Sequence, residues 1–158
     1  MIHKEAWYTE AEEKTPKPLY VCRHLVNVDD LLSWAEDQGF GETLDADDLH
    51  VTQLYSQSPV EWGTFDPQTD ELVIRGGERE VHPLGDEGAI VLRFNAGPLQ
   101  KRHKEFLEGG GSHGYDSYKP HVTITYEPGD LDISQVEPYT GDLVFGPEEF
   151  NEIEKDAV

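Results

Sequence analysis

The pattern His-Val-Thr-x-x-Tyr occurs twice in this chain, beginning at His50 and at His121. Each copy lies in a run of β-prone residues, and the side chains of a strand alternate between its two faces. His50 and Thr52 therefore point to one side of their strand, and His121 and Thr123 point to one side of theirs. Two such strands beside a common groove would surround a bound group with two imidazoles and two hydroxyl donors. These groups can cleave a phosphodiester by acid–base chemistry without a metal ion.

A strand and a helix are predicted before each motif strand, in the same order in both halves of the chain. The three elements are residues 19–25, 27–39 and 49–56 in the first half, and residues 89–95, 97–109 and 120–126 in the second half. This repetition predicts an α+β fold with two pseudo-symmetric lobes of antiparallel strands and with helices on the outside. The two His-x-Thr strands would then lie side by side along a central cleft.

The helix ends and the remaining strands are predicted from turn and cap residues. Asn27 is expected to cap the first helix and Gly39 to end it. Strands at residues 71–75 and 79–84 are expected to form a hairpin through Gly76-Gly77. The last strand is expected at residues 141–145, followed by acidic residues from Glu148 onward.

The domain organisation is predicted to be simple. Residues 1–18 mix Glu, Lys and Pro and favour an extended lead-in, residues 19–150 form a single bilobal domain, and residues 151–158 form an acidic tail. No apolar run approaches the length of a membrane span, so we expect no membrane partner and a cytoplasmic location.

The charge balance limits the partners of this protein. Among 158 residues, 33 acidic and 12 basic residues give a formal net charge of −21. Duplex nucleic acid is therefore not expected as a partner, because its binding draws on arrays of lysine and arginine. A small anionic ligand would need a local positive pocket. The candidate residues are Arg23, Arg75, Arg79, Arg93, Lys101, Arg102, Lys104 and Lys119.

Neither a metal nor a cofactor is expected from the sequence. The single cysteine, Cys22, excludes an internal disulfide and a cysteine-rich zinc site, and it is expected to be a small buried hydrophobic side chain. No acidic or cysteine ligand stands at a recognisable spacing from His50 and His121, which argues against a metal site built on the motif histidines.

With its two His-x-Thr motifs in matching halves, the chain resembles the 2H phosphoesterase superfamily. Within that group it is similar to the phage anti-CBASS phosphodiesterases, which degrade the cyclic oligonucleotide messengers of bacterial immunity. Three segments carry this narrower resemblance. They are Leu19-Tyr20-Val21-x-Arg23 with the helix after it, Tyr55-Ser56-x-x-Pro59-Val60-x-Trp62, and Tyr118-Lys119-Pro120.

The resemblance implies a metal-independent phosphodiesterase that hydrolyses the 3′,5′ bonds of cyclic di- or trinucleotides, in an infected host cell if the protein comes from a phage. One motif histidine would take a proton from a 2′-hydroxyl or a water, and the other would protonate the departing 5′-oxygen. The sequence leaves open which does which. Thr52 and Thr123 would hydrogen-bond the non-bridging phosphate oxygens.

Four further residues are candidates for contact with substrate. By resemblance, Tyr20 would contact the phosphate or a base, and Glu149 would contact a base or ribose. Trp62 could stack on a base or could belong to the core. Lys119 precedes the second motif and could offset ligand charge.

Two alternative functions remain at this point. The first is a phosphodiesterase of the same superfamily that acts on 2′,5′-oligonucleotides or on nucleoside 2′,3′-cyclic phosphates. The second is a non-catalytic module that binds cyclic nucleotides. A module that only binds its ligand would have no use for a paired general acid and general base.

Overall fold

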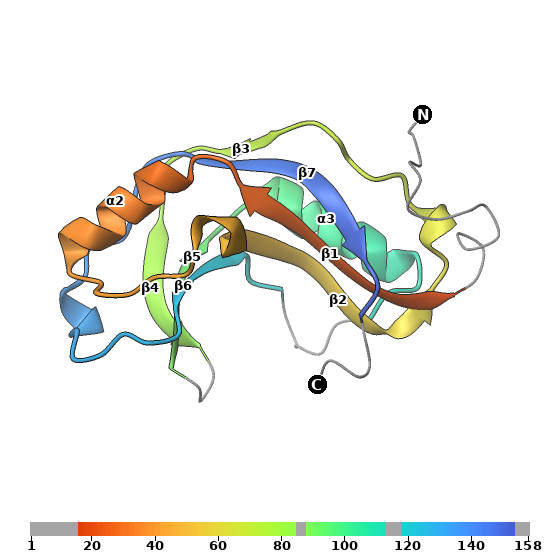
Figure 1. Ribbon diagram of the computed structural model, residues 1–158. Helices are drawn as coiled ribbons and strands as arrows, with labels where there is room; N and C mark the ends of the chain where they lie inside the picture. The colour runs from red at the N-terminus through yellow and green to blue at the C-terminus, as the bar shows by residue number, and fades with distance from the viewer. Residues whose placement is uncertain (1–15, 85–87, 113–117, 154–158) are drawn as a thin grey trace.

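Seven strands form one curved antiparallel sheet in the computed structural model, which describes residues 16–84, 88–112 and 118–153 (Figure 1). Along the sheet the strands follow the order β3-β7-β1-β2-β6-β5-β4. Their bounds are β1 Lys17–Leu25, β2 His50–Val60, β3 Leu72–Ile74, β4 Arg79–Leu84, β5 Ala89–Phe94, β6 His121–Thr125 and β7 Leu143–Asn151. The predicted α+β class with its antiparallel strands is confirmed, and the two motif strands, β2 and β6, are neighbours at the centre of the sheet.

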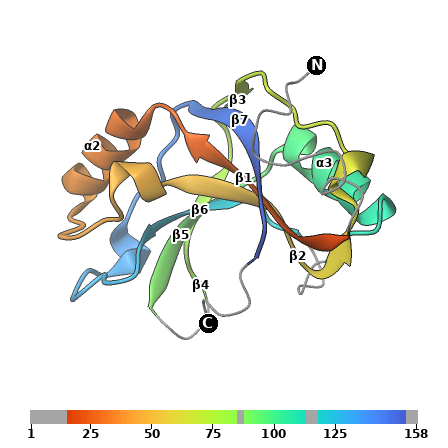
Figure 2. The ribbon, with the colours of Figure 1, turned by 45° about the vertical axis from the view of Figure 1, so that its right-hand side comes forward.

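Two helices, α2 (Val28–Gln38) and α3 (Gly97–Glu108), lie toward opposite ends of the curved sheet (Figure 2). Both pack on the same face. Leu31 of α2 and Leu99 of α3 join the cluster that contains Val51 and Val122 of the motif strands, and Phe106 of α3 joins a second cluster with Leu19, Val21 and Leu54. Neither helix in the described residues has the length and apolar character that a membrane crossing requires.

The ends of α2 follow the sequence only in part. Gly39 ends the helix as predicted, with a left-handed φ of 98° that lets its N–H bond the carbonyls of Ala35 and Glu36. Asn27 precedes the helix but its side chain does not cap it. Instead its Oδ1 accepts from the N–H of Val144 at 2.9 Å and its Nδ2 donates to the carbonyl of Asp142 at 2.8 Å. Asn27 therefore ties α2 to β7.

The predicted hairpin through Gly76-Gly77 is wrong. β3 pairs with β7 at one edge of the sheet, whereas β4 pairs with β5 at the other edge. Each of the six residues of β4 has a partner on β5, and neither glycine adopts the positive φ that a tight hairpin turn requires. Gly76 has a different role, because a Cβ at this position would overlap the carbonyl of Thr140.

The end of the chain also differs from the sequence-based expectation. β7 continues through Gly146-Pro147 and includes Glu148 and Glu149, which were expected to lie beyond the last strand. The side chain of Glu148 is fully buried and receives two hydrogen bonds from Arg102 of α3, each 2.9 Å long. The backbone N–H of Gln68 adds a third at 2.8 Å. The predicted tail, residues 151–158, lies mostly outside the described residues.

The buried ion pair predicts a large loss of stability in the variant Arg102→Met. This change removes both hydrogen bonds that Arg102 donates to the buried Glu148 carboxylate, and breaking a buried pair from one side costs about 3–5 kcal/mol. We expect the free energy of unfolding, measured by urea denaturation, to fall by about that amount. Arg75→Met is the matched control, since Arg75 is 82% exposed beside Asp142 and such a pair is worth about 0–1 kcal/mol. Equal stability of the two variants would contradict this account of Glu148.

Candidate active site

The two motif strands are aligned by a buried valine pair. Val51 and Val122 are direct partners in the antiparallel pairing of β2 with β6, and both are 0% exposed. The residues on either side of this pair point to the opposite face of the sheet. Because the strands run antiparallel, His50 lies across from Thr123 and Thr52 lies across from His121. The four motif side chains thus form one partly exposed group on the face away from the core.

Both motif histidines are held by the same local contact. His50 Nδ1 lies 2.7 Å from the carbonyl oxygen of Asp48, and His121 Nδ1 lies 2.9 Å from that of Lys119. A carbonyl oxygen can only accept a hydrogen bond, so each Nδ1 carries the hydrogen. In each ring the Nε2 atom is therefore the nitrogen that can take or deliver a proton.

The environment of His121 favours its neutral form. Burial lowers the pKa of His121 below its usual value, and the positive charges of His50 and Arg93 lower it further, against a raising effect of the Lys119 carbonyl. The two imidazoles stand on adjacent strands, on either side of the Val51–Val122 pair and on the same face of the sheet. At neutral pH His121 is thus able to accept a proton.

Arg93 places a cation beside this group. It is the direct partner of His121 in the pairing of β5 with β6, and its side chain is 23% exposed. Its Nη1 atom lies 3.5 Å from Glu80 on the edge strand β4. Sequence analysis named Arg93 only as one of eight basic candidates, because nothing in its local pattern shows which strand will pair beside it.

Tyr20 of β1 contacts the first motif. Its hydroxyl lies 3.3 Å from Thr52 Oγ1, and its ring meets the ring of His50 edge-on at 6.3 Å between centroids. Burial raises the pKa of Tyr20, so the phenol keeps its proton and can serve as a hydrogen-bond donor. The structure therefore brings Tyr20 to the motif residues.

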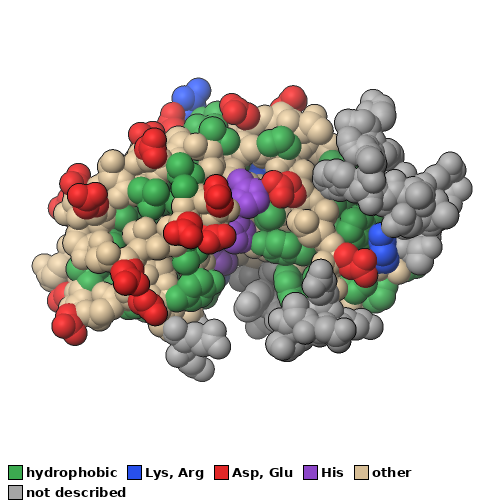
Figure 3. All heavy atoms as spheres, in the orientation of Figure 1, with side chains coloured by type: hydrophobic (Ala, Val, Ile, Leu, Met, Phe, Trp, Pro, Cys, Tyr) green, Lys and Arg blue, Asp and Glu red, His purple; other side chains and the backbone are tan. Residues whose placement is uncertain are grey.

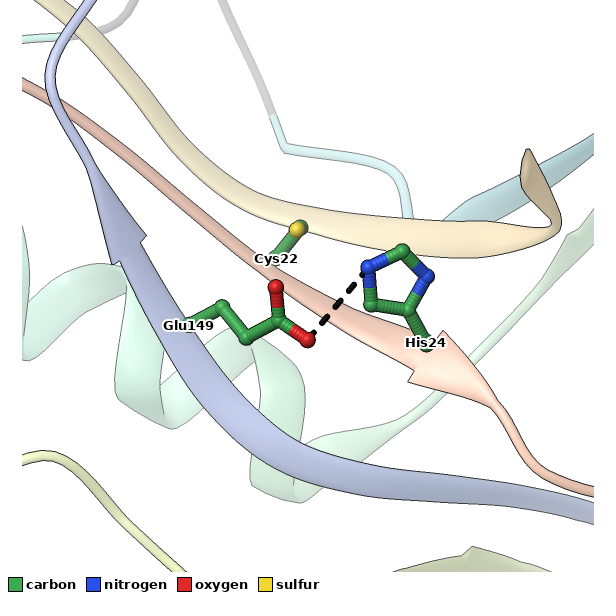
Figure 4. Close-up of side chains that lie close together, drawn as sticks. All are labelled: Cys22, His24 and Glu149. Atoms are coloured by element: carbon green, nitrogen blue, oxygen red, sulfur yellow. Dashed lines mark ion pairs between the residues drawn. The ribbon is translucent and has the colours of Figure 1, made fainter. Parts of the chain in front are cut away.

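Three further side chains extend this face across β1 and β7. Cys22 is the partner of Thr52, and His24 is the partner of His50, with 6.1 Å between the two imidazole centroids. Glu149 of β7 pairs with Cys22, and its Oε2 lies 3.4 Å from His24 Nε2 (Figure 4). Burial raises the pKa of the Cys22 thiol to about 11. On the molecular surface, histidine side chains gather at the middle of one face with acidic side chains around them (Figure 3).

Two of the predicted contacts lie differently. Trp62 is 4% exposed and packs against Phe150 in the core cluster on the other face of the sheet, so its position does not support the predicted stacking on a base. The side chain of Lys119 is exposed, and its backbone carbonyl orients His121. The described contacts therefore support a positioning role for this segment through its main chain.

A β-bulge beneath the site is fixed by an aromatic stack. Leu54 and Thr52 pair with successive residues of β1, so Gln53 has no partner there. Its backbone carbonyl is 2.7 Å from His103 Nδ1, and the His103 ring stacks on Tyr118 at 4.3 Å. The hydroxyl of Tyr118 in turn donates to the carbonyl of Thr52 at 2.7 Å. Sequence reasoning missed both aromatic supports, since their partners are distant along the chain.

A family model described as "Acb1: Anti-CBASS protein Acb1" matches residues 17–158 of this chain. Two similar relatives are the anti-CBASS proteins Acb1 of Caulobacter sp. (strain RHG1), 52% identical over 150 residues, and of Sphingomonas paeninsulae, 50% identical over 151 residues. These matches cover 92% and 91% of this chain but 24% of each relative, so the chain spans about a quarter of their length. The Acb1 protein of Vibrio phage KVP40 is 33% identical over 86 residues, which are 53% of this chain and 54% of the relative.

Solved structures with a similar fold include Escherichia coli LigT in complex with 3′-AMP and a protein described as a phosphoesterase. Each has a TM-score of 0.55, and each match covers 89% of this chain and 97% of the solved chain. At 12% sequence identity, this likeness establishes the fold and carries no residue roles. The 2H phosphoesterase-like fold predicted from the two motifs is confirmed.

The site geometry predicts how His121 titrates. In an NMR pH titration we expect its midpoint to lie below the usual value of about 6.5, with the hydrogen on Nδ1 in the neutral form. Arg93→Gln removes a positive charge that disfavours the imidazolium, so the midpoint should move to higher pH. Lys104→Gln, an exposed change on α3, is the control and should leave it in place. A midpoint unmoved by Arg93→Gln would mean that Arg93 does not act on this imidazole.

Proposed function

This chain belongs to the family of anti-CBASS protein Acb1, and on that premise we propose that it hydrolyses 3′,5′-phosphodiester bonds of cyclic di- or trinucleotides. The observation that supports this most is the arrangement across β2 and β6. Two imidazoles, each anchored through Nδ1, lie on one open face, and each stands across from a threonine hydroxyl. This arrangement suits acid–base chemistry on a single phosphate.

His121 is proposed as the general base and His50 as the general acid. The lowered pKa of His121 keeps it neutral, so its Nε2 can take the proton of a ribose 2′-hydroxyl or of a water molecule. The oxygen so activated bonds to phosphorus. The bond from phosphorus to the 5′-oxygen breaks, and protonated His50 gives its Nε2 proton to that oxygen. The ring is thereby opened, and each histidine ends in the protonation state in which the other began. Attack by water leaves a 3′-phosphate, whereas attack by the 2′-hydroxyl leaves a 2′,3′-cyclic phosphate that a water molecule opens in a second step with the two histidine roles exchanged.

The hydroxyl groups of Thr52 and Thr123 are proposed to donate to the non-bridging oxygens, where negative charge grows in the transition state. One such donor is worth roughly 3 kcal/mol to the rate. Tyr20 would hold the Thr52 hydroxyl through their 3.3 Å contact. Arg93 would offset the phosphate charge from the neighbouring strand, which this acidic protein needs at its site.

Glu149 is proposed to contact a base or the ribose, as the family resemblance implies. Its half-buried side chain lies on the same face as Tyr20 and beside His24, which supports this proposal. Lys119 would offset ligand charge only if its exposed side chain turns toward the bound nucleotide.

Loss of either motif histidine is expected to abolish turnover. General acid or base catalysis is worth about 10²–10⁴-fold, so His50→Gln and His121→Gln should each lower kcat by at least that factor. Turnover of a panel of cyclic di- and trinucleotides, 2′,5′-oligonucleotides and 2′,3′-cyclic phosphates would be followed by chromatography in the presence of a chelator. Lys104→Gln, an exposed change on α3, serves as the control. Undiminished hydrolysis by either motif variant, or intact recovery of every ligand from the wild type, would end the proposal.

The threonine role predicts a separate effect. Thr123→Val keeps the shape of the side chain but removes the donor, and kcat/KM should fall by about 10²–10³-fold. Thr64→Val, at an exposed position outside the site, should leave it unchanged. Circular dichroism would establish that both variants keep the fold. Near wild-type kinetics of Thr123→Val would remove the hydroxyl from the proposed mechanism.

A further inference from the structure

Three side chains with metal-binding atoms converge on the open face beside the motif residues (Figure 4). Cys22 and His24 stand two residues apart on β1 and therefore share a face, and Glu149 reaches them from β7. The thiol sulfur, an imidazole nitrogen and a carboxylate oxygen all lie within 4.8 Å of one another. His24 Nε2 lies 3.4 Å from Glu149 Oε2.

We propose that Cys22, His24 and Glu149 form a binding site for a zinc ion. A thiolate, an imidazole and a carboxylate are the three ligand types that Zn²⁺ takes in proteins. Mg²⁺ and Ca²⁺ take oxygen ligands, so a set with one sulfur and one nitrogen disfavours them. Three protein ligands leave the fourth position of a tetrahedral zinc ion open to water or to another ligand.

The separations fit a zinc ion after small side-chain rotations. Zinc bonds of about 2.0–2.3 Å hold tetrahedral ligands roughly 3.3–3.8 Å apart, and the imidazole and carboxylate already satisfy this distance. The remaining atoms must approach by about 1 Å. His24 and Glu149 can make this movement because their side chains are 42% and 45% exposed, which also gives the ion a path from solvent. The buried thiol of Cys22 provides the fixed ligand and loses its proton on binding.

The charge around the site favours a cation. The chain has a formal net charge of −21, and acidic side chains surround the histidines on this face of the molecule (Figure 3). When a divalent ion binds, the contact between His24 Nε2 and Glu149 Oε2 would be replaced by one bond from each residue to the ion. The same field opposes the approach of an anion, so the site and its surroundings suit zinc better than a second phosphate.

Bound zinc would occupy part of the proposed substrate cleft. Glu149 would be engaged by the metal, and the ion would lie beside Thr52, the direct partner of Cys22. Zinc would therefore compete with the nucleotide. This consequence rests on the proposed function, whereas the binding of zinc does not depend on it and is tested without substrate.

Cobalt(II) is a suitable probe, because Cys22 is the only cysteine of the chain. A thiolate-to-cobalt charge-transfer band in the near ultraviolet can then arise from Cys22 alone. Titration of Co²⁺ into the full-length, reduced and tag-free protein should raise this band to saturation at one equivalent. Added Zn²⁺ should bleach the band by displacement. Absence of the band, or a band that Zn²⁺ does not displace, would overturn the proposal.

Variants identify the other two ligands. Cys22→Ser should abolish the band, and His24→Gln and Glu149→Gln should weaken binding by more than the roughly 10–100-fold that loss of an outer-shell partner costs. His82→Gln and Glu71→Gln, both outside the cluster, should bind Co²⁺ as the wild type does. Thermal unfolding in chelator would establish that each variant is folded. If Cys22→Ser does not fold, His24→Gln and Glu149→Gln still test the proposal. Unchanged Co²⁺ affinity in both of these variants would refute the site.

Discussion

The alignment of β2 with β6 is the constraint on which the site depends. These strands are joined through Val51 and Val122, a pair sealed in the core at 0% exposure. Because side chains alternate along a strand, burial of the two valines forces the histidine and threonine of each motif to the other face. A slip of one residue would place polar imidazoles in the core and valines on the open face. The hydrophobic cost of that exchange holds the motif histidines and threonines on the open face.

The two faces of the sheet have different roles: one forms the core, and the other carries the motif residues. One face packs against both helices and contains the apolar clusters together with the buried pair of Arg102 and Glu148. This pair fixes β7 against α3, so the adjacent Glu149 is presented on the opposite face. The stack of His103 on Tyr118 similarly fixes the bulge after Thr52. Buried polar contacts on the core side therefore set the positions of groups on the open side.

The acidity of the chain has a consistent physical interpretation. A charge of −21 disfavours long polyanions, and the short anionic substrate proposed above would depend on local cations such as Arg93 beside His121. The acidic groups near the histidines are not only a solvated surface, because Glu149 contacts His24 and faces the thiol of Cys22. The cation Arg93 and the acidic group Glu149 thus lie on the same open face, on different sides of the motif residues.

The sequence by itself determined the faces of the motif strands, the central position of both motifs, the fold class and the end of α2 at Gly39. These features follow from period-two alternation and local backbone preference, which neighbouring residues decide. Only the tertiary structure decided that β3 and β4 lie at opposite edges of the sheet, that β7 continues through Gly146-Pro147, and that Asn27 bonds β7. It also brought Arg93, Cys22, His24 and Glu149 to the site and assigned Trp62 to the core. Each of these features depends on which distant segments of the chain pair with one another. The energy of such pairing is shared between residues far apart in the sequence, so a local sequence pattern does not predict it.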